Sequence, residues 1–322
     1  MERNSFIAAL RSDRSPQRQA QGAIAQAHLA WLAESGVRDL MADLKRYGAG
    51  APLENCFVLE TLFTGTGEAE RVLDLLQAHY CSAIRANPIA HPPFRNGFDG
   101  RASSLQLARV GRAQLMLQAR EPGEFTSESY GFSDGTRFEA VVAGKAEARI
   151  IRAHRFGDSA MQFETQRVSM NGGERLTLDL SSEALVIDKV EQRLVILRLI
   201  RTAAEPEPTR EYCAQSRELL HQSAGLISTS RQEAIIALLG RMGRTDAAPE
   251  MARIALAESD LSLRWQALRE CLALDSEVGF CTLARIARDG QDPLSAAAGA
   301  LRAQLLEQYP EFAQVEAQQC PA

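Results

Sequence analysis

The chain has 322 residues and a formal net charge of −5, with 45% hydrophobic and 24% charged residues. A chain of this length and composition forms two or three structural units and buries a core without disulfides or metal. The acidic balance argues against general nucleic-acid binding, which needs a basic excess. No apolar run reaches the ~20 residues that span a bilayer, and no signal-peptide core follows the N-terminus. We therefore expect a soluble, cytoplasmic protein of bacterial type that binds neither nucleic acid nor membrane.

The six cysteines and five histidines form no metal-binding pattern. No two cysteines make a C-x-x-C pair, and no histidine is two, three or four residues from another. Closely spaced pairs of that kind are typical of zinc sites. We expect reduced, mostly buried thiols, and we predict no metal and no other cofactor.

The N-terminal region, residues 1–104, is predicted to be mainly helical. Apolar residues recur at helical spacing over 22–47, where Gly36 separates two short helices. Two more helices are predicted over 53–63 and 68–84, before a proline-containing segment forces extended backbone.

Residues 105–202 are predicted to form an antiparallel β sandwich or barrel. An alternating run over 105–119 is followed by six short β-like runs between 137 and 200, separated by glycine-containing turns. Short strands at this spacing are typical of all-β domains. The G-x-S-x-G sequence at 131–135 matches a nucleophile elbow, but a strand pattern follows where an elbow needs a helix. We predict a hairpin turn there and name no catalytic residue.

Residues 203–322 are predicted to comprise a proline-rich linker and a helical repeat array. The sequence MARIA at 251–255 recurs as LARIA at 283–287, and the ALR at 267–269 recurs at 300–302. A period of 32–33 residues is typical of a helical solenoid, in which stacked helix pairs cover one another's apolar faces.

Two segments resemble known families. Residues 230–307 resemble HEAT-type repeats, which usually bind proteins, so this resemblance implies recognition rather than chemistry. Alternatively, the array only packs on the β domain. Residues 138–148 resemble the strand–glycine–strand element of a cupin's first motif, but residues 130–134 contain no histidine where a metal-binding cupin has His-x-His. This resemblance implies a cupin-like barrel without the usual ligands, and the whole chain an α+β protein with a HEAT-like C-terminal α-solenoid.

The candidate ligand-binding residues lie at the end of one β run. Charged groups at a barrel mouth hold acidic ligands, and here the side chains are those of Arg152, His154 and Arg155. A wider basic strip across neighbouring strands is a related hypothesis, although alternation places two of its members on opposite faces. Its members are Arg149, Arg152, Arg193, Arg198 and Arg201.

The candidate partner-binding residues lie on a predicted repeat helix. Trp and Arg are frequent at the centres of interfaces, and Arg264, Trp265 and Arg269 combine the two types. We expect Arg264 to be exposed, whereas packing of Trp265 in the core is the alternative.

The sequence therefore favours a non-catalytic adaptor, regulatory or assembly protein that binds a protein partner or a small ligand. The alternative is a cupin-like small-molecule sensor or a metal-free enzyme with its pocket in the β domain.

Overall fold

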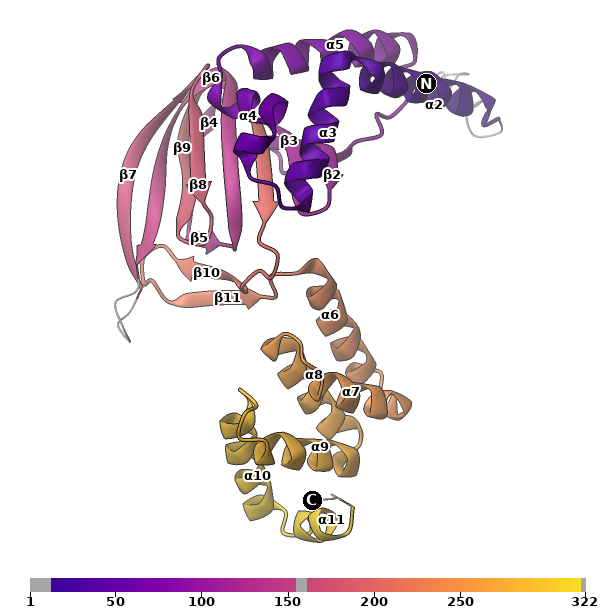
Figure 1. The fold of residues 1–322 in the computed structure, drawn as a ribbon, viewed down its shortest axis with the longest axis vertical. Coiled ribbons are helices and arrows are strands. Elements are labelled where there is room, and N and C mark those ends of the chain that lie inside the picture. Colours follow the sequence, from indigo (N-terminus) through magenta and orange to yellow (C-terminus); the bar gives the residue numbers. More distant parts are fainter. Residues whose placement is uncertain (1–12, 155–160, 320–322) are drawn as a thin grey trace, which may run out of the picture. The chain divides into compact units, whose positions relative to one another are not determined.

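The computed structural model describes residues 13–154 and 161–319. The chain divides into two compact units, here called the β unit (1–206 and 210–220) and the helical unit (207–209 and 221–322). Three parts were predicted, but the N-terminal helices and the strands share one unit (Figure 1). Within the described ranges, each helix is too short or too polar to cross a membrane.

Within the described residues, four α-helices and one 3-10 turn precede the strands of the β unit, as the apolar spacing predicted. Ile24, Trp31, Leu40 and Leu44 are fully buried between them. The buried carboxylate of Asp43 accepts hydrogen bonds from the first backbone amides of α4, which a helix cannot satisfy internally. The bounds are α2 Ser15–Ala33, α3 Ser35–Ala49, η1 Leu53–Asn55, α4 Phe57–Thr64 and α5 Glu68–Ala86.

Eleven described strands follow, and they lie in the β unit apart from residues 209 and 221–223, which fall within the helical unit. The main antiparallel sheet has the order β1-β2-β3-β9-β6-β7, with β4 paired to β9 and β8 paired to β6, and a smaller sheet has the order β11-β10-β5. The bounds are β1 Arg95–Phe98, β2 Ala102–Val110, β3 Ala113–Arg120, β4 Gly123–Glu124, β5 Ser129–Phe132, β6 Gly135–His154, β7 Gln162–Asn171, β8 Arg175–Asp179, β9 Glu183–Thr202, β10 Thr209–Cys213 and β11 Leu219–Ser223. The α+β class and the antiparallel pairing agree with the prediction.

The two 20-residue strands, β6 and β9, each replace two predicted strands. Their pairing register shifts on both sides of Lys145. Gly144 has a φ of +97°, and a Cβ there would lie 2.2 Å from the carbonyl oxygen of Arg193. The glycine that was taken as a turn therefore lets one strand bend and continue.

The N-terminal helices cover one face of the main sheet (Figure 1). Alternation along β3, β6 and β9 turns Leu115, Ala140 and Leu197 toward these helices, where all three are fully buried. Arg201 at the end of β9 stacks over the ring of Tyr47 in α3, at 4.0 Å from the ring centre. The side chains that alternate with these residues along the same strands point to the opposite face of the sheet, away from the N-terminal helices.

Strands β10 and β11 correct the prediction that the chain is a linker and then helical after residue 202. Tyr212 in β10 pairs with Tyr130 in β5, and its ring meets those of Phe132 and Phe163 at about 6.1–6.2 Å between centres. The aromatic cluster holds this segment in the β unit.

The helical unit contains six described α-helices and one 3-10 turn. The repeated sequences fall on alternate helices, with 251–255 in α7 and 283–287 in α9, and 267–269 in α8 and 300–302 in α10. Ala267, Leu268 and Leu283 lie in its buried core. The bounds are α6 Ile227–Arg241, η2 Thr245–Ala247, α7 Ala248–Ala255, α8 Leu261–Leu274, α9 Ser276–Arg288, α10 Ser295–Gln308 and α11 Phe312–Gln319.

The expectation of reduced thiols is wrong for one cysteine. Cys281 in α9 is disulfide-bonded, whereas Cys56, Cys81, Cys213 and Cys271 are free thiols. Burial raises the pKa of the Cys271 thiol to about 11, so this thiol is protonated at neutral pH and packs as an apolar group.

A buried ion pair joins three segments of the helical unit. Arg264 in α8 is only 6% exposed, and its Nε donates to the carbonyl oxygen of Ala255 at the end of α7. Its Nη2 donates to the carboxylate of Asp292, which precedes α10. The expectation that Arg264 is exposed is therefore wrong, because its guanidinium is used inside the unit.

We predict that Arg264→Met lowers the free energy of unfolding of the helical unit by about 3 kcal/mol, because Asp292 keeps a buried charge without its partner. Hydrogen exchange measured on α8–α10 peptides checks this. Arg253→Met, which removes an exposed pair with Glu250, is the matched control and should leave the exchange of these peptides nearly unchanged, because solvent screens an exposed pair. Equal exchange in the two variants would contradict the structural role of Arg264.

Candidate functional site

A cavity of about 260 Å³ opens in the β unit. Two of its lining residues are arginines, and none of the described lining residues is Asp, Glu, His or Cys. The exposed Thr126 and Ser127 place its mouth at the loop between β4 and β5. The lining residues are Arg120, Phe125, Thr126, Ser127, Ser129, Tyr130, Gly131, Arg137, Leu180, Ala184, Leu185, Val186 and Ile187.

Arg137 reaches the cavity because of its position in β6. Side chains alternate along a strand, so Arg137 and Glu139 share the face that points away from the N-terminal helices. In the paired register, Glu139 lies directly opposite Arg198 of β9, and Arg137 lies opposite Ile200. Three charged side chains are thereby brought together on one face of two neighbouring strands.

One carboxylate serves two guanidinium groups in this cluster. Glu139 is fully buried, and Arg198 Nε donates to both of its oxygens at 2.9 and 3.1 Å while Nη2 lies 2.7 Å from Oε1. Arg137 Nε lies 3.1 Å from the same oxygen without the geometry of a hydrogen bond. The Nε and Nη2 atoms of Arg137 are buried and have no hydrogen-bond partner among the described residues. Arg198 therefore takes the hydrogen bonds of Glu139, and Arg137 is left with charge proximity alone.

The pKa of Arg137 is shifted because its guanidinium is buried, with no hydrogen-bond acceptor for Nε and Nη2 among the described residues. Burial lowers the pKa of its guanidinium to about 10; the charge of Glu139 counteracts this effect, and repulsion by Arg198 and Arg120 adds to it. The group remains a cation at neutral pH. Arg149, further along the same strand, is matched by its own carboxylate: two hydrogen bonds of 2.7 Å to Asp188 raise its pKa. The same strand thus carries one paired and one underpaired arginine.

Arg120 is the second arginine of the cavity. It lies at the end of β3, its guanidinium carbon is 5.6 Å from the centre of the Phe125 ring, and its Nε is buried without a hydrogen-bond partner among the described residues. Burial and then repulsion by Arg198 lower its pKa, while the charges of Asp99 and Glu139 oppose the shift. A guanidinium that lies over an aromatic ring still directs its N–H groups outward in its own plane, where they can donate to other acceptors.

The predicted ligand-binding residues lie elsewhere in the β unit. Arg152 donates to Glu183 at 2.8 Å, and His154 Nε2 lies 3.6 Å from Glu164. Neither residue lines the cavity, and Arg155 lies outside the described residues. A ligand role for these three residues stays a prediction.

The predicted basic strip is wrong, because its members do not share one surface. Arg198 pairs with Glu139 on the face of the sheet that points away from the N-terminal helices, here called the inner face. Arg201 packs on the N-terminal helices, and Arg193 is exposed beside Glu121.

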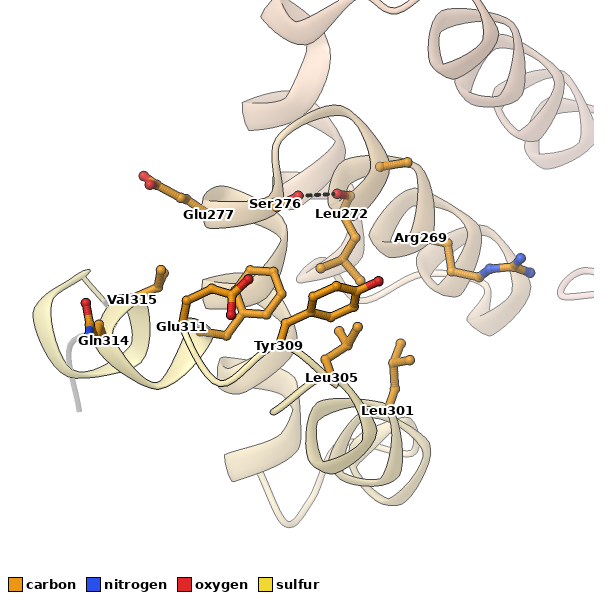
Figure 2. Close-up of a pocket in the computed structure, with 12 residues that line it drawn as sticks. Arg269, Leu272, Ser276, Glu277, Leu301, Leu305, Tyr309, Glu311, Gln314 and Val315 are labelled. Atoms are coloured by element: carbon orange, nitrogen blue, oxygen red, sulfur yellow. Dashed lines mark hydrogen bonds between the residues drawn. The ribbon is translucent and has the colours of Figure 1, made fainter. Parts of the chain in front are cut away.

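A groove of about 900 Å³ lies in the helical unit, between α8, α9, α10 and α11 (Figure 2). Arg269, predicted to bind a partner, is exposed on one side of this groove, and Glu277 lies on the other. Trp265 is half-buried and lines a smaller recess beside Arg269. The apolar lining of the groove consists of Leu272, Ala273, Leu301, Leu305, Tyr309, Phe312 and Val315.

Sequence reasoning missed Arg120 and Arg137. A usable signal was present in β6, where Arg137 and Glu139 alternate with Phe138 and Ala140 and precede Val141 on their own face. Charged residues that share a face with a core valine point inward. The pairing of Glu139 with Arg198 was not available from the sequence, because it depends on the register of two strands. In the described ranges, no group of three or more His, Cys, Asp or Glu side chains is placed to hold a metal ion.

We predict that Arg137→Met raises the free energy of unfolding of the ligand-free protein by about 1 kcal/mol, because it removes a buried cation that lacks a matched partner. The midpoint of the β-unit transition in differential scanning calorimetry checks this. Arg198→Met should do the opposite, at a cost of about 3 kcal/mol, because it strips Glu139 of its hydrogen bonds. Equal destabilisation by the two substitutions would show that Arg137 is an ordinary structural partner of Glu139.

No family model matches the chain, and no curated protein matches it. Solved structures that resemble it include a cupin superfamily protein from Desulfitobacterium hafniense, with 18% identity, a TM-score of 0.25 and coverage of 33% of this chain and 83% of that chain. A putative mannose-6-phosphate isomerase from Ralstonia eutropha is 15% identical, with a TM-score of 0.24 and coverage of 33% and 88%. The vicilin from Solanum melongena, described as having different anionic ligands in structurally similar pockets, is 13% identical, with a TM-score of 0.29 and coverage of 43% and 42%. Proteins of the cupin class, which residues 138–148 resemble, are thus among the solved structures that are similar to this chain.

Proposed function

We propose that the β unit binds a small anionic ligand in the cavity lined by Arg120 and Arg137, and that the protein acts as a sensor or regulator of that ligand. The observation that carries the proposal is the buried, underpaired guanidinium of Arg137. A buried cation is costly unless an anion and hydrogen-bond acceptors face it. An anionic ligand supplies both, and charge-assisted hydrogen bonds to arginine are among the strongest available.

The cavity lining favours binding over catalysis. Its described polar side chains are two arginines and the hydroxyls of Thr126, Ser127, Ser129 and Tyr130. General acid–base chemistry at neutral pH is mostly carried by His, Asp, Glu or Cys, and the described lining has none of these. This supports the sensor over the metal-free enzyme.

We predict that small anions stabilise the protein against thermal unfolding in a saturable way, because they bind the folded state only. Sulfate, phosphate and malonate, each compared with chloride at the same ionic strength, are the probes. Arg137→Met should abolish the anion-dependent rise in the unfolding midpoint.

Arg109→Met is the control for that experiment, because Arg109 is an exposed arginine on β2 and does not line the cavity. It should keep the full rise. A rise that survives Arg137→Met, or no rise with any anion, would contradict the proposal.

A second candidate function rests on the helical unit, which we propose is a HEAT-like array that binds a protein partner. The supporting observation is the groove of Figure 2, with an apolar floor and opposite charges on its two sides. Figure 2 shows Arg269 on one side and Glu277 on the other, and Glu311 also lines the groove. The complementary occupant is an amphipathic helix of another protein, with an acidic residue near Arg269 and a basic residue near the two glutamates.

We predict that peptides selected from a displayed library against the whole protein share apolar residues at i, i+3 or i+4, and i+7, because this spacing presents one face to a groove. Tyr309→Ala should weaken a selected peptide at least about tenfold, and Leu238→Ala, which removes an equally exposed apolar side chain of α6 outside the groove, should not. Affinity measured by fluorescence anisotropy checks this. The proposed partner would be contradicted by selected peptides whose affinity is unchanged in Tyr309→Ala, or by self-association of the protein through the groove.

A further inference from the structure

We infer that the ligand of the β-unit cavity is a small dicarboxylate, whose two acid groups are held by Arg137 and Arg120. This inference rests on the proposed anion-binding function and adds the charge and the shape of the ligand.

The count of charges favours two acid groups. Two arginines line the cavity, and the carboxylate nearest to them, Glu139, accepts its hydrogen bonds from Arg198. The exposed Asp99 and the buried Glu139 offset the charge of Arg120 in part, but each arginine keeps at least one buried N–H without an acceptor among the described residues. A single carboxylate satisfies one guanidinium through two parallel hydrogen bonds, so two guanidiniums call for two carboxylates.

The directions of approach favour two groups that are separated from each other. Arg120 lies opposite Leu194 of β9, whereas Arg137 lies opposite Ile200 of the same strand. The two backbones are thus six residues apart along β9, which is roughly 20 Å of strand, and the side chains converge on one cavity from different sides. Two carboxylates joined by a short chain present an acceptor to each side.

The walls between the arginines suit a short carbon chain. Phe125, Leu180, Leu185 and Ile187 contribute apolar surface to the lining. The hydroxyl of Ser127 already donates to the carbonyl oxygen of Ser129, and the hydroxyl of Ser129 donates to Glu211, so both protons are used within the protein. The volume of about 260 Å³ lies below the range of drug-sized sites, so the cavity suits a small molecule such as a short dicarboxylate.

Isothermal titration calorimetry on the full chain tests the inference. The probes are acetate and propionate as monocarboxylates, malonate, succinate and glutarate as dicarboxylates of increasing length, and sulfate as a compact dianion. We expect one dicarboxylate to bind at least about tenfold tighter than either monocarboxylate and tighter than sulfate. Arg120→Met should reduce its affinity to that of a monocarboxylate, and it should change acetate binding by no more than about twofold. Arg109→Met should leave all affinities unchanged.

The outcomes separate the two proposals. If anions bind and Arg137→Met abolishes binding, but dicarboxylates have no advantage over acetate or sulfate, the dicarboxylate inference fails and the anion site stands. If a dicarboxylate is preferred but the preference survives Arg120→Met, the assignment of the second acid group to Arg120 fails. If none of the probes binds, or if their affinities are unchanged in Arg137→Met, the proposed function fails together with the inference.

Discussion

Strand alternation in β3, β9 and β6 is the constraint on which the rest of the β unit depends. One set of side chains, which includes Leu115, Leu197 and Ala140, is turned toward the N-terminal helices and is fully buried there. The other set has to face the opposite side, and it carries Arg120, Arg198 and the pair Arg137 and Glu139. The same pleat that builds the apolar interface therefore concentrates charge on the inner face, and a change of register by one residue would exchange the two sets.

Charge is unevenly matched on this inner face. Glu139 satisfies Arg198 and leaves Arg137 with proximity but without a hydrogen bond. A fold selected for stability alone would pair this cation or replace it with an apolar side chain. Binding sites commonly keep such a cost, since the group that destabilises the empty protein is the one that binds the ligand. The helical unit shows the contrasting case, where Arg264 has its partners within the unit.

Elements with a strong local pattern could be predicted from the sequence. The helical spacing of Ile24 and Leu44 identified the N-terminal helices, and alternation identified most strands of the β unit. The 32-residue repeat separated α7 to α10 into two similar pairs. Local pattern did not reveal that Gly144 bends a strand without ending it, because that depends on the close approach of Arg193. Local pattern also predicted helix where β10 forms, because Tyr212 is held in that strand by aromatic residues about 50 to 80 positions earlier.

The candidate site was harder to predict for the same physical reason. Arg137 and Arg198 are distant in sequence, and their meeting depends on the pairing of β6 with β9. The residues chosen from local charge, Arg152 and His154, face carboxylates on adjacent strands. Arg264 was expected to be exposed from its residue type and helix position, whereas its burial follows from Asp292 in the next helix pair. The sequence pattern shows which strands and helices carry charged side chains. Which of these side chains find a partner depends on strand pairing and helix packing.

A crystal structure of the protein grown with the preferred dicarboxylate tests the central claim most directly. We expect one carboxylate within hydrogen-bond distance of Nη2 of Arg137, the second beside Arg120, and the Glu139–Arg198 pair unchanged. An empty cavity in which the Arg137 guanidinium makes its own two hydrogen bonds to Glu139, with the dicarboxylate bound elsewhere or absent, would contradict it.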